Sequence, residues 1–187
     1  MARWTPHADE RLIKAAVELF AQRGYEETTV ADIASRAGLT KRTFFRYFSD
    51  KREVLFSGAQ ELELVWVRGL REAPEDAGPV AAVEVGLGAI AEMFTERHPF
   101  ARIRARIIAA NPELQERELI KLEKLASAGA IALERRGVSA DAAALAARTG
   151  VGIFHLAFGR WIAQDDPGAL GRLLRESMGE LRKLLTT

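Results

Sequence analysis

The chain has 187 residues, 48% hydrophobic and 28% charged, which is enough apolar material for a core and too much for a disordered chain. It contains no cysteine, and this excludes a disulfide framework and a thiolate zinc site. The net charge is only +1, but residues 1–52 hold ten Lys and Arg against seven Asp and Glu, whereas residues 53–187 hold seventeen against nineteen. The positive charge is therefore local, as in a nucleic-acid footprint.

The first predicted element is a helix over residues 6–23. Thr5 followed by Pro6 is a favourable helix start, and Gly24 is a favourable stop. Apolar residues recur inside this segment at i, i+3, i+4 and i+7. That spacing predicts one buried face.

Two short helices joined by a tight turn are predicted next. Thr29 and Asp32 have the spacing of a capping box that begins a helix at the following residue. Gly38 turns the chain, and Thr40 can cap a third helix over residues 41–48. This arrangement is the helix-turn-helix pattern, in which the second helix enters the major groove of DNA.

The rest of the chain is predicted to be helical as well, without a strand signal or an internal repeat. Asp50 and Glu53 have the character of a helix start, and residues 73–79 form the clearest loop. The predicted helices are 50–71, 79–97, 99–110, 112–136, 140–164 and 168–185. We therefore expect an all-α fold of about nine helices, with a helix-turn-helix domain over residues 1–50 and a larger helical ligand-binding and dimerisation domain over residues 51–187.

A cluster of cations marks the third predicted helix and its surroundings. Residues 36–52 contain one acidic residue, Asp50, and six basic ones: Arg36, Lys41, Arg42, Arg46, Lys51 and Arg52. Phe44 and Phe48, four apart, would hold the helix against its neighbours and leave the basic side outward. We expect Arg42 to contact a base edge, and Lys51 and Thr29 to contact phosphates. A merely solvated basic face is the alternative reading.

The segment TTVADIASRAGLTKRTFFRYFSDKREVL resembles the N-terminal domain of the TetR family of bacterial transcriptional regulators, and the similarity covers about residues 8–56. The helix caps, the turn glycine, the aromatic pair and the following Asp-Lys all fall in register. The resemblance implies DNA contacts by Thr29, Thr40, Lys41, Arg42, Thr43, Phe45, Tyr47 and Lys51. Phe45 stands where many members have Tyr, so one hydroxyl that could bond a phosphate is missing.

The last two predicted helices have the composition of an association surface. Residues 140–161 are rich in Ala and Gly, and a leucine-rich stripe follows, formed by Leu170, Leu173, Leu174, Met178, Leu181 and Leu185. In TetR-like proteins such helices pair with those of a second chain, which implies a homodimer. The stripe fits an intramolecular core equally well.

A ligand site in the second domain is implied by the same resemblance. The large side chains considered for its lining are Trp66, Met93, Phe94, His98, Phe100, Ile107, Phe154, His155, Phe158 and Trp161. No dense polar cluster stands out, which favours an apolar or amphipathic effector. The segment FARIRARIIAANPEL also resembles regulators of the mycofactocin-associated kind, for which acyl-CoA ligands are implied. Arg102 and Arg106 could hold a phosphate, or they could form a solvated face.

No catalytic or metal-binding pattern is present. The three histidines share no metal-ligand spacing, and the loose dinucleotide pattern GLGAIA lies inside a helical run. We therefore expect no enzyme activity, no cofactor and no metal. The predicted function is a cytoplasmic, ligand-responsive repressor that binds palindromic double-stranded DNA and no membrane. The alternative is a ligand-independent architectural or protein-binding factor associated with DNA.

Overall fold

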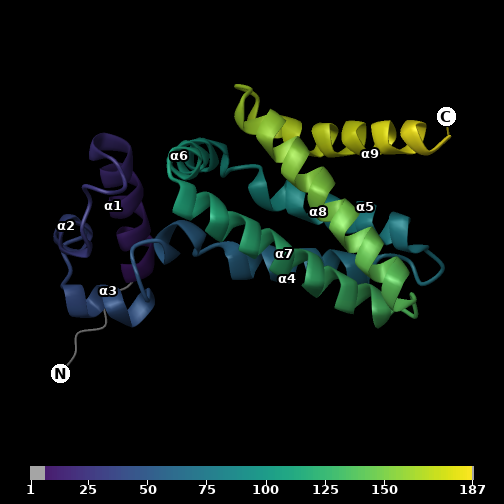
Figure 1. Ribbon diagram of the computed structural model, residues 1–187, viewed down its shortest axis with the longest axis horizontal. Helices are drawn as coiled ribbons and strands as arrows, with labels where there is room; N and C mark the ends of the chain where they lie inside the picture. Colours follow the sequence, from purple (N-terminus) through teal and green to yellow (C-terminus); the bar gives the residue numbers. More distant parts are fainter. Residues whose placement is uncertain (1–6, 187) are drawn as a thin grey trace. The chain divides into compact units, whose positions relative to one another are not determined.

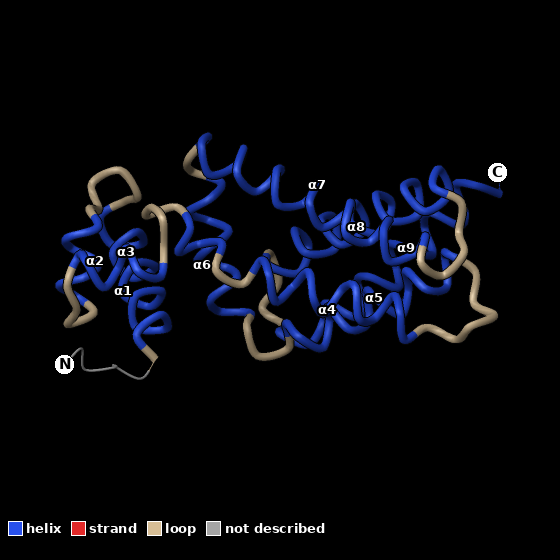
Figure 2. Tube along the Cα trace, turned by 90° about the horizontal axis from the view of Figure 1, so that it is seen from below, coloured by secondary structure: helices blue, strands red, loops and turns tan. Residues whose placement is uncertain are grey.

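The computed structural model describes residues 7–186, which form helices and connecting turns with no strand among them (Figure 1, Figure 2). The α-helices of this part of the chain are α1 (Ala8–Arg23), α2 (Val30–Arg36), α3 (Lys41–Tyr47), α4 (Ala59–Glu72), α5 (Pro79–Phe94), α6 (His98–Ala109), α7 (Pro112–Glu134), α8 (Ala140–Ile162) and α9 (Leu170–Thr186). Two short 3-10 segments are η1 (Glu53–Phe56) and η2 (Pro167–Ala169). The all-α prediction is confirmed. Thr5 and Pro6, predicted to begin the first helix, lie outside the described residues.

The chain divides into two compact units. The first contains α1, α2, α3 and η1, together with Ile103–Gln115, the segment at the end of α6 and the start of α7. The second contains α4, α5, α8 and α9 with the remaining parts of α6 and α7. The predicted division after residue 50 placed all later residues in the second domain, including Ile103–Gln115.

The core of the first unit is formed by one apolar face from each of its three α-helices. Leu12 on α1, Ile33 on α2 and Phe44 on α3 are fully buried in it. Gly38 makes the turn between α2 and α3 with φ 64°, in the left-handed region that favours glycine. A Cβ at this position would lie 2.8 Å from Nη2 of Arg11, which donates to the carbonyl of the preceding residue. The turn therefore favours glycine for its left-handed backbone, and a larger residue would also displace the end of the Arg11 side chain.

The segment after α3 differs from its prediction. The carboxylate of Asp50 accepts hydrogen bonds from the backbone N–H groups of Arg52 (2.8 Å) and Glu53 (3.2 Å), as expected of a helix start. The helix does not continue to residue 71, because η1 ends at Phe56 and α4 begins only at Ala59. The continuous helix predicted over 50–71 is wrong. Residue 58 in the interruption is glycine, which has the lowest helix propensity after proline.

The core of the second unit surrounds the indole ring of Trp66 on α4, which is fully buried. Gly86 on α5, Gly129 on α7 and Gly150 on α8 all face this ring. A Cβ would lie 2.6 Å from the ring at Gly86, 3.0 Å at Gly150 and closer still at Gly129. Four helices can therefore close on one ring because three of them present bare backbone there. The indole N–H has no hydrogen-bond partner among the described residues.

The leucine-rich stripe on α9 belongs mostly to this core. Leu170, Leu173, Leu174 and Met178 are buried in it, whereas Leu185 is exposed. Of the two readings that the sequence left open for the stripe, the intramolecular one holds for these four residues. The helix α8 is long and apolar enough to cross a membrane by length and composition alone, a test that core helices also pass, and much of its apolar surface lies in the same core.

Candidate functional site

The helix-turn-helix begins with a complete capping box at α2. The hydroxyl of Thr29 accepts a hydrogen bond from the backbone N–H of Asp32 (3.2 Å), and the Asp32 carboxylate accepts from the backbone N–H of Thr29 (2.9 Å). The Thr29 hydroxyl also lies 2.7 Å from that carboxylate. Hydrogen bonds from the Thr29 hydroxyl and N–H hold the pKa of Asp32 below its usual range. Both polar groups of Thr29 are thus already engaged within the unit.

The recognition helix α3 is capped at one end and braced from behind. The hydroxyl of Thr40 accepts a hydrogen bond from the backbone N–H of Thr43 (3.1 Å) and lies 3.0 Å from the Thr43 hydroxyl. Phe44 and Phe48 are buried, with ring centroids 5.5 Å apart. The predicted bracing by these two rings is confirmed. It fixes which face of α3 is turned outward.

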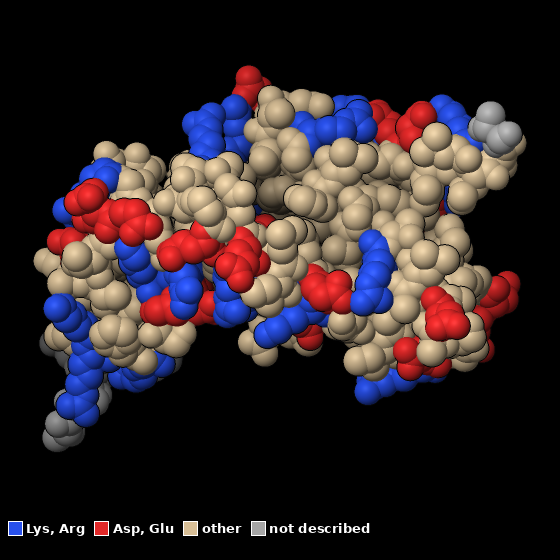
Figure 3. All heavy atoms as spheres, in the orientation of Figure 1, with Lys and Arg blue, Asp and Glu red and all other residues tan. Residues whose placement is uncertain are grey.

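The outward face of α3 is basic and aromatic. Lys41 and Arg42 are exposed, and neither makes a hydrogen bond or ion pair with another described residue. Phe45 is 57% exposed, so its phenyl ring adds apolar area to this face. In Figure 3, Lys and Arg side chains gather over α3 and the neighbouring part of the first unit. Two free cations and an open ring on one short helix suit a polyanion with stacked, partly apolar components.

Arg46 joins this face, although the sequence motif assigns it no contact. Its guanidinium carbon lies 5.0 Å from the centroid of the Tyr47 ring, and its Nη2 donates to the Tyr47 hydroxyl (3.1 Å). Arg46 follows Arg42 by four residues, so the pair adds positive charge to the same side of the helix. The only sequence signal for this contact is an Arg directly before an aromatic residue. That signal is weak, because the two side chains interact only when their geometry brings them together.

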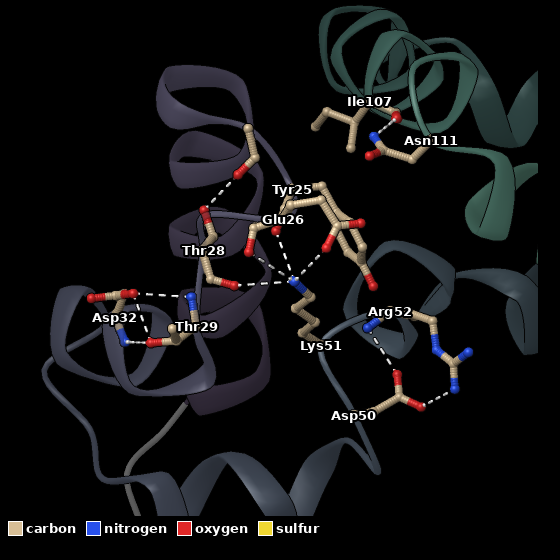
Figure 4. A network of polar contacts seen from close by, with 11 residues as sticks. Tyr25, Glu26, Thr28, Thr29, Asp32, Asp50, Lys51, Arg52, Ile107 and Asn111 are labelled. Carbon is tan, nitrogen blue, oxygen red and sulfur yellow. Dashed lines mark hydrogen bonds and ion pairs between the residues drawn. The ribbon is translucent and has the colours of Figure 1, made fainter.

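Lys51 has a different environment from the one expected of a phosphate contact. Its ammonium donates to the carbonyl of Tyr25 (2.9 Å), lies 3.4 Å from the carbonyls of Glu26 and Thr28, and sits 4.1 Å from the centroid of the Tyr25 ring (Figure 4). These contacts fix the connection between α1 and α2. A phosphate contact by Lys51 therefore stays a prediction that would require the ammonium to share its present partners.

An aromatic cluster lies in the second unit. Phe94 on α5 packs against Phe154, Phe158 and Trp161 of α8, with ring centroids 5.4–6.0 Å apart. The buried His98 adds its ring 4.6 Å from that of Trp161, and its Nε2 lies 3.2 Å from the Trp161 carbonyl. Five of the side chains considered for a ligand site are thus brought together, and no metal-binding group of His, Cys, Asp and Glu occurs among the described residues.

The other predicted lining residues lie elsewhere. Trp66 is buried in the same core but against the three glycines, and Met93 is half-buried. Phe100 and His155 are exposed. Ile107 is buried in the core of the first unit. In the sequence these residues share only their large size. Size does not distinguish a residue of the packed core from one that lines a ligand cavity.

Comparison with known proteins matches both parts of the chain. Residues 12–57 match the family model described as bacterial regulatory proteins, tetR family, and residues 77–186 match the MftR C-terminal domain. The transcriptional regulator TcmR of Streptomyces glaucescens is 35% identical over 81 residues, 43% of this chain and 36% of TcmR. MftR of Mycobacterium tuberculosis, whose name refers to mycofactocin biosynthesis, is 33% identical over 115 residues, 59% of this chain and 54% of MftR. The matches thus span about a third to a half of these curated relatives.

Solved structures match over nearly the whole chain. FadR from Thermus thermophilus, a TetR family repressor solved in complex with lauroyl-CoA, is 27% identical, with a TM-score of 0.55 over 95% of this chain and 93% of FadR. FadR from Bacillus halodurans, a fatty acid degradation regulator, has a TM-score of 0.60 at 22% identity, which shows a shared fold. With a TetR-type DNA-binding segment followed by an MftR-type domain that fills more than half of its length, the chain belongs to the TetR family of DNA-binding transcriptional regulators, which are not enzymes.

Proposed function

We propose that the chain is a repressor that binds a palindromic operator as a homodimer in the cytoplasm and is released by a small, largely apolar molecule. The observation that carries the proposal is the outward face of α3. Lys41 and Arg42 stand free at its N-terminus, while Phe44 holds the helix from behind. A major groove admits a helix of this width, and Arg42 has the forked donors that fit the two acceptors of guanine.

The operator contacts would be shared between base edges and the backbone. Arg42 and Thr43 face the bases, whereas Lys41, Phe45 and Tyr47 approach the phosphates and sugars together with Thr40 at the helix start. Thr29 and Lys51 would contact phosphates only by sharing their present hydrogen bonds. Two such helices about 34 Å apart would meet successive major grooves on one face of the duplex. This geometry requires two chains and a palindromic site.

The face of α8 that is turned away from the core supports a homodimer. Leu145 is 70% exposed and Leu156 is 61% exposed, and both lie on the same side of the helix as the exposed Gly152 and Gly159. No side chain lies within 4 Å of the Cβ position of either glycine. A second copy of α8 could approach closely along this side, because glycine leaves the backbone bare and leucine supplies apolar area.

The proposed effector is a fatty acyl thioester or another hydrophobic compound. The T. thermophilus FadR complex with lauroyl-CoA supports this class, as does the cluster of Phe94, Phe154, Phe158, Trp161 and His98 in the MftR-type part of the chain. The cluster provides apolar area and few charges, which suits an acyl chain better than a sugar. Arg102, which lies close to Asp165 in the same unit as the cluster, is a candidate positive charge for a phosphate-bearing head group.

The proposal is tested in two steps. The native protein is first used to select duplexes from a randomised DNA pool, and palindromic duplexes are expected, with an affinity that falls steeply as salt rises because bound phosphates release counterions. Lauroyl-CoA is then titrated into the complex and is expected to release the DNA. Selection of no duplex would contradict the DNA-binding part. Selection without release by lauroyl-CoA, by other acyl thioesters or by aromatic compounds would favour a ligand-independent factor.

A further inference from the structure

The corner between α6 and α7 completes the core of the DNA-binding unit. Ile107 and Ile108 near the end of α6 and Leu114 in the first turn of α7 are buried in the same cluster as Tyr25 and Phe56. The N-terminal segment therefore does not bury its apolar surface by itself. About fifty residues separate this corner from η1 along the chain, so nothing in the helix-turn-helix motif indicates it.

One arginine of this corner contacts η1 directly. Nε of Arg104 donates to the carbonyl of Leu55 at 2.6 Å, and its guanidinium carbon lies 5.0 Å from the centroid of the Phe56 ring. The last carbonyls of a short 3-10 segment have no partner within the segment. The charged guanidinium of Arg104 satisfies one of these carbonyls. It holds η1 at its C-terminal end, just before Ser57 and Gly58 separate η1 from α4.

A second contact holds the other side of the same corner. Tyr25 is buried beside Lys51, and burial, with a hydrogen bond to Glu113 and its negative charge, raises the pKa of the Tyr25 hydroxyl well above its usual value. Tyr25 is thus a neutral donor to the carboxylate at the start of α7. The segment from Lys51 to Phe56, which follows the recognition helix, therefore contacts the corner directly at Leu55 and Phe56 and is linked to it through Tyr25 at Lys51.

We propose that Arg104 is a positioning residue for DNA binding, which holds η1 and, through it, the C-terminal end of α3 in the orientation that meets the duplex. Arg104 contacts Leu55 and Phe56, whose side chains share one core with Phe44 and Phe48 of the recognition segment. Without this contact, α3 would sample more orientations, and DNA binding would have to restrict them at an entropic cost. The inference rests on the DNA binding described above, but it adds a residue far from the helix-turn-helix.

The test compares Arg104→Gln with Arg106→Gln. Both substitutions remove one positive charge from α6, but the exposed side chain of Arg106 makes no hydrogen bond or ion pair with another described residue. The probe is a duplex selected by the native protein from a randomised pool. Arg104→Gln is expected to lower the affinity about tenfold, the size of one lost charge-assisted hydrogen bond, whereas Arg106→Gln keeps the native affinity.

Two further readouts separate positioning from DNA contact and from general stability. The salt dependence of binding should be equal in the two variants, because a lost phosphate contact would lower its slope by about one. Amide hydrogen exchange in Arg104→Gln should accelerate at Val54–Phe56 and stay native at Leu12–Ala16 in α1. Arg104→Lys should recover only part of the affinity, since an ammonium cannot place one N–H on Leu55 and a flat face on Phe56 together.

Equal affinities for Arg104→Gln and Arg106→Gln, a reduced salt slope only in Arg104→Gln, or accelerated exchange throughout α1 would each overturn the proposal. If Arg104→Gln does not fold, the comparison of Arg104→Lys with Arg106→Lys decides by the same measurements. A native protein that selects no duplex would contradict the proposed function instead, before either variant is compared.

Discussion

At the scale of single residues, the basic side chains at the start of α3 make no hydrogen bond or ion pair within the described part of the chain. Arg42 has no hydrogen-bond or ion-pair partner among the described residues, so replacing it leaves the unit intact and tests DNA binding alone. Lys51 and Thr29 differ, because each also holds part of the unit together. Substitutions at those two positions would mix lost contacts with lost structure.

We expect Arg42→Ala to weaken operator binding by about 1–3 kcal/mol and to relax the preference at one base position, because a bidentate contact to guanine is lost. The measurement is the affinity for the selected duplex and for its single-base variants. Arg175→Ala, which removes an exposed positive charge from the second unit, serves as the control and should leave both unchanged. An equal loss on every sequence would show that Arg42 contacts only phosphate.

The capping box of α2 should give the protein a specific sensitivity to acid. Its hydrogen bonds hold the pKa of Asp32 below the unfolded value, so the stability they contribute is complete above about pH 4 and is lost as the pH falls through the folded value. The unfolding midpoint, followed by circular dichroism across a pH series, should therefore drop more steeply in the native protein than in Asp32→Asn.

Asp76→Asn is the matched control for this series. Asp76 is an exposed loop residue without a hydrogen bond or ion pair to another described residue, so its replacement should preserve the native pH dependence. If Asp32→Asn shows the native slope as well, the capping box has no role in acid stability.

At the scale of the elements, local sequence signals predicted the helix-turn-helix well. The caps at Thr29 and Thr40, the turn at Gly38 and the bracing by Phe44 each depend on residues within a few positions of one another, and all are present. The signal failed after Asp50, where the periodic apolar residues fit one long helix. The interruption before α4 accompanies a contact from Arg104, and such a distant contact has no local signature.

The packing of Trp66 predicts opposite effects for two glycines on α5. Gly86→Ala places a Cβ 2.6 Å from the indole ring and should lower the free energy of unfolding by about 1–3 kcal/mol through overpacking. Gly88→Ala, two positions on, adds a Cβ with nothing within 4 Å and should raise it by up to about 1 kcal/mol, since alanine favours a helix.

Urea unfolding followed by circular dichroism measures both variants. When both variants are made in a Trp66→Leu background, Gly86→Ala should lower the free energy of unfolding much less, because the smaller side chain leaves room for the new methyl group. Equal effects of the two alanines in the native background would mean that the indole can move aside at little cost.

At the scale of the whole molecule, the proposed homodimer makes a prediction on α8. Leu156→Arg places a charge on the side of α8 proposed to meet a second chain, and it should convert a dimer into single chains in light scattering because a buried, unpaired charge is costly. Affinity for the palindromic duplex should fall much more than affinity for a duplex with one half-site. The exposed Leu64 on α4 provides the control, and Leu64→Arg should keep the native mass. A native protein that scatters as a single chain would refute the dimer.

The sequence predicted a DNA-binding segment followed by a larger helical domain. It did not predict which later residues complete the core of the first unit. Composition and periodicity were sufficient for an all-α chain, and the motif was sufficient for a DNA-binding segment. Ile107 and Leu114 pack into the core of the first unit although they are far from its helices in sequence. The helical spacing of an apolar residue shows that it is buried but does not show in which core. The same limit explains why Ile107 was grouped with the ligand-lining candidates.

The indole of Trp66 and the three glycines around it also restrict how this chain can change over evolutionary time. A methyl group at Gly86 or Gly129 requires a smaller residue at position 66, whereas one at Gly150 would also lie 2.8 Å from the side chain of Val83. Position 66 and the glycines at 86 and 129 should therefore change together, so that relatives retaining the tryptophan keep both glycines, whereas relatives that have lost it show alanine or serine at these two positions.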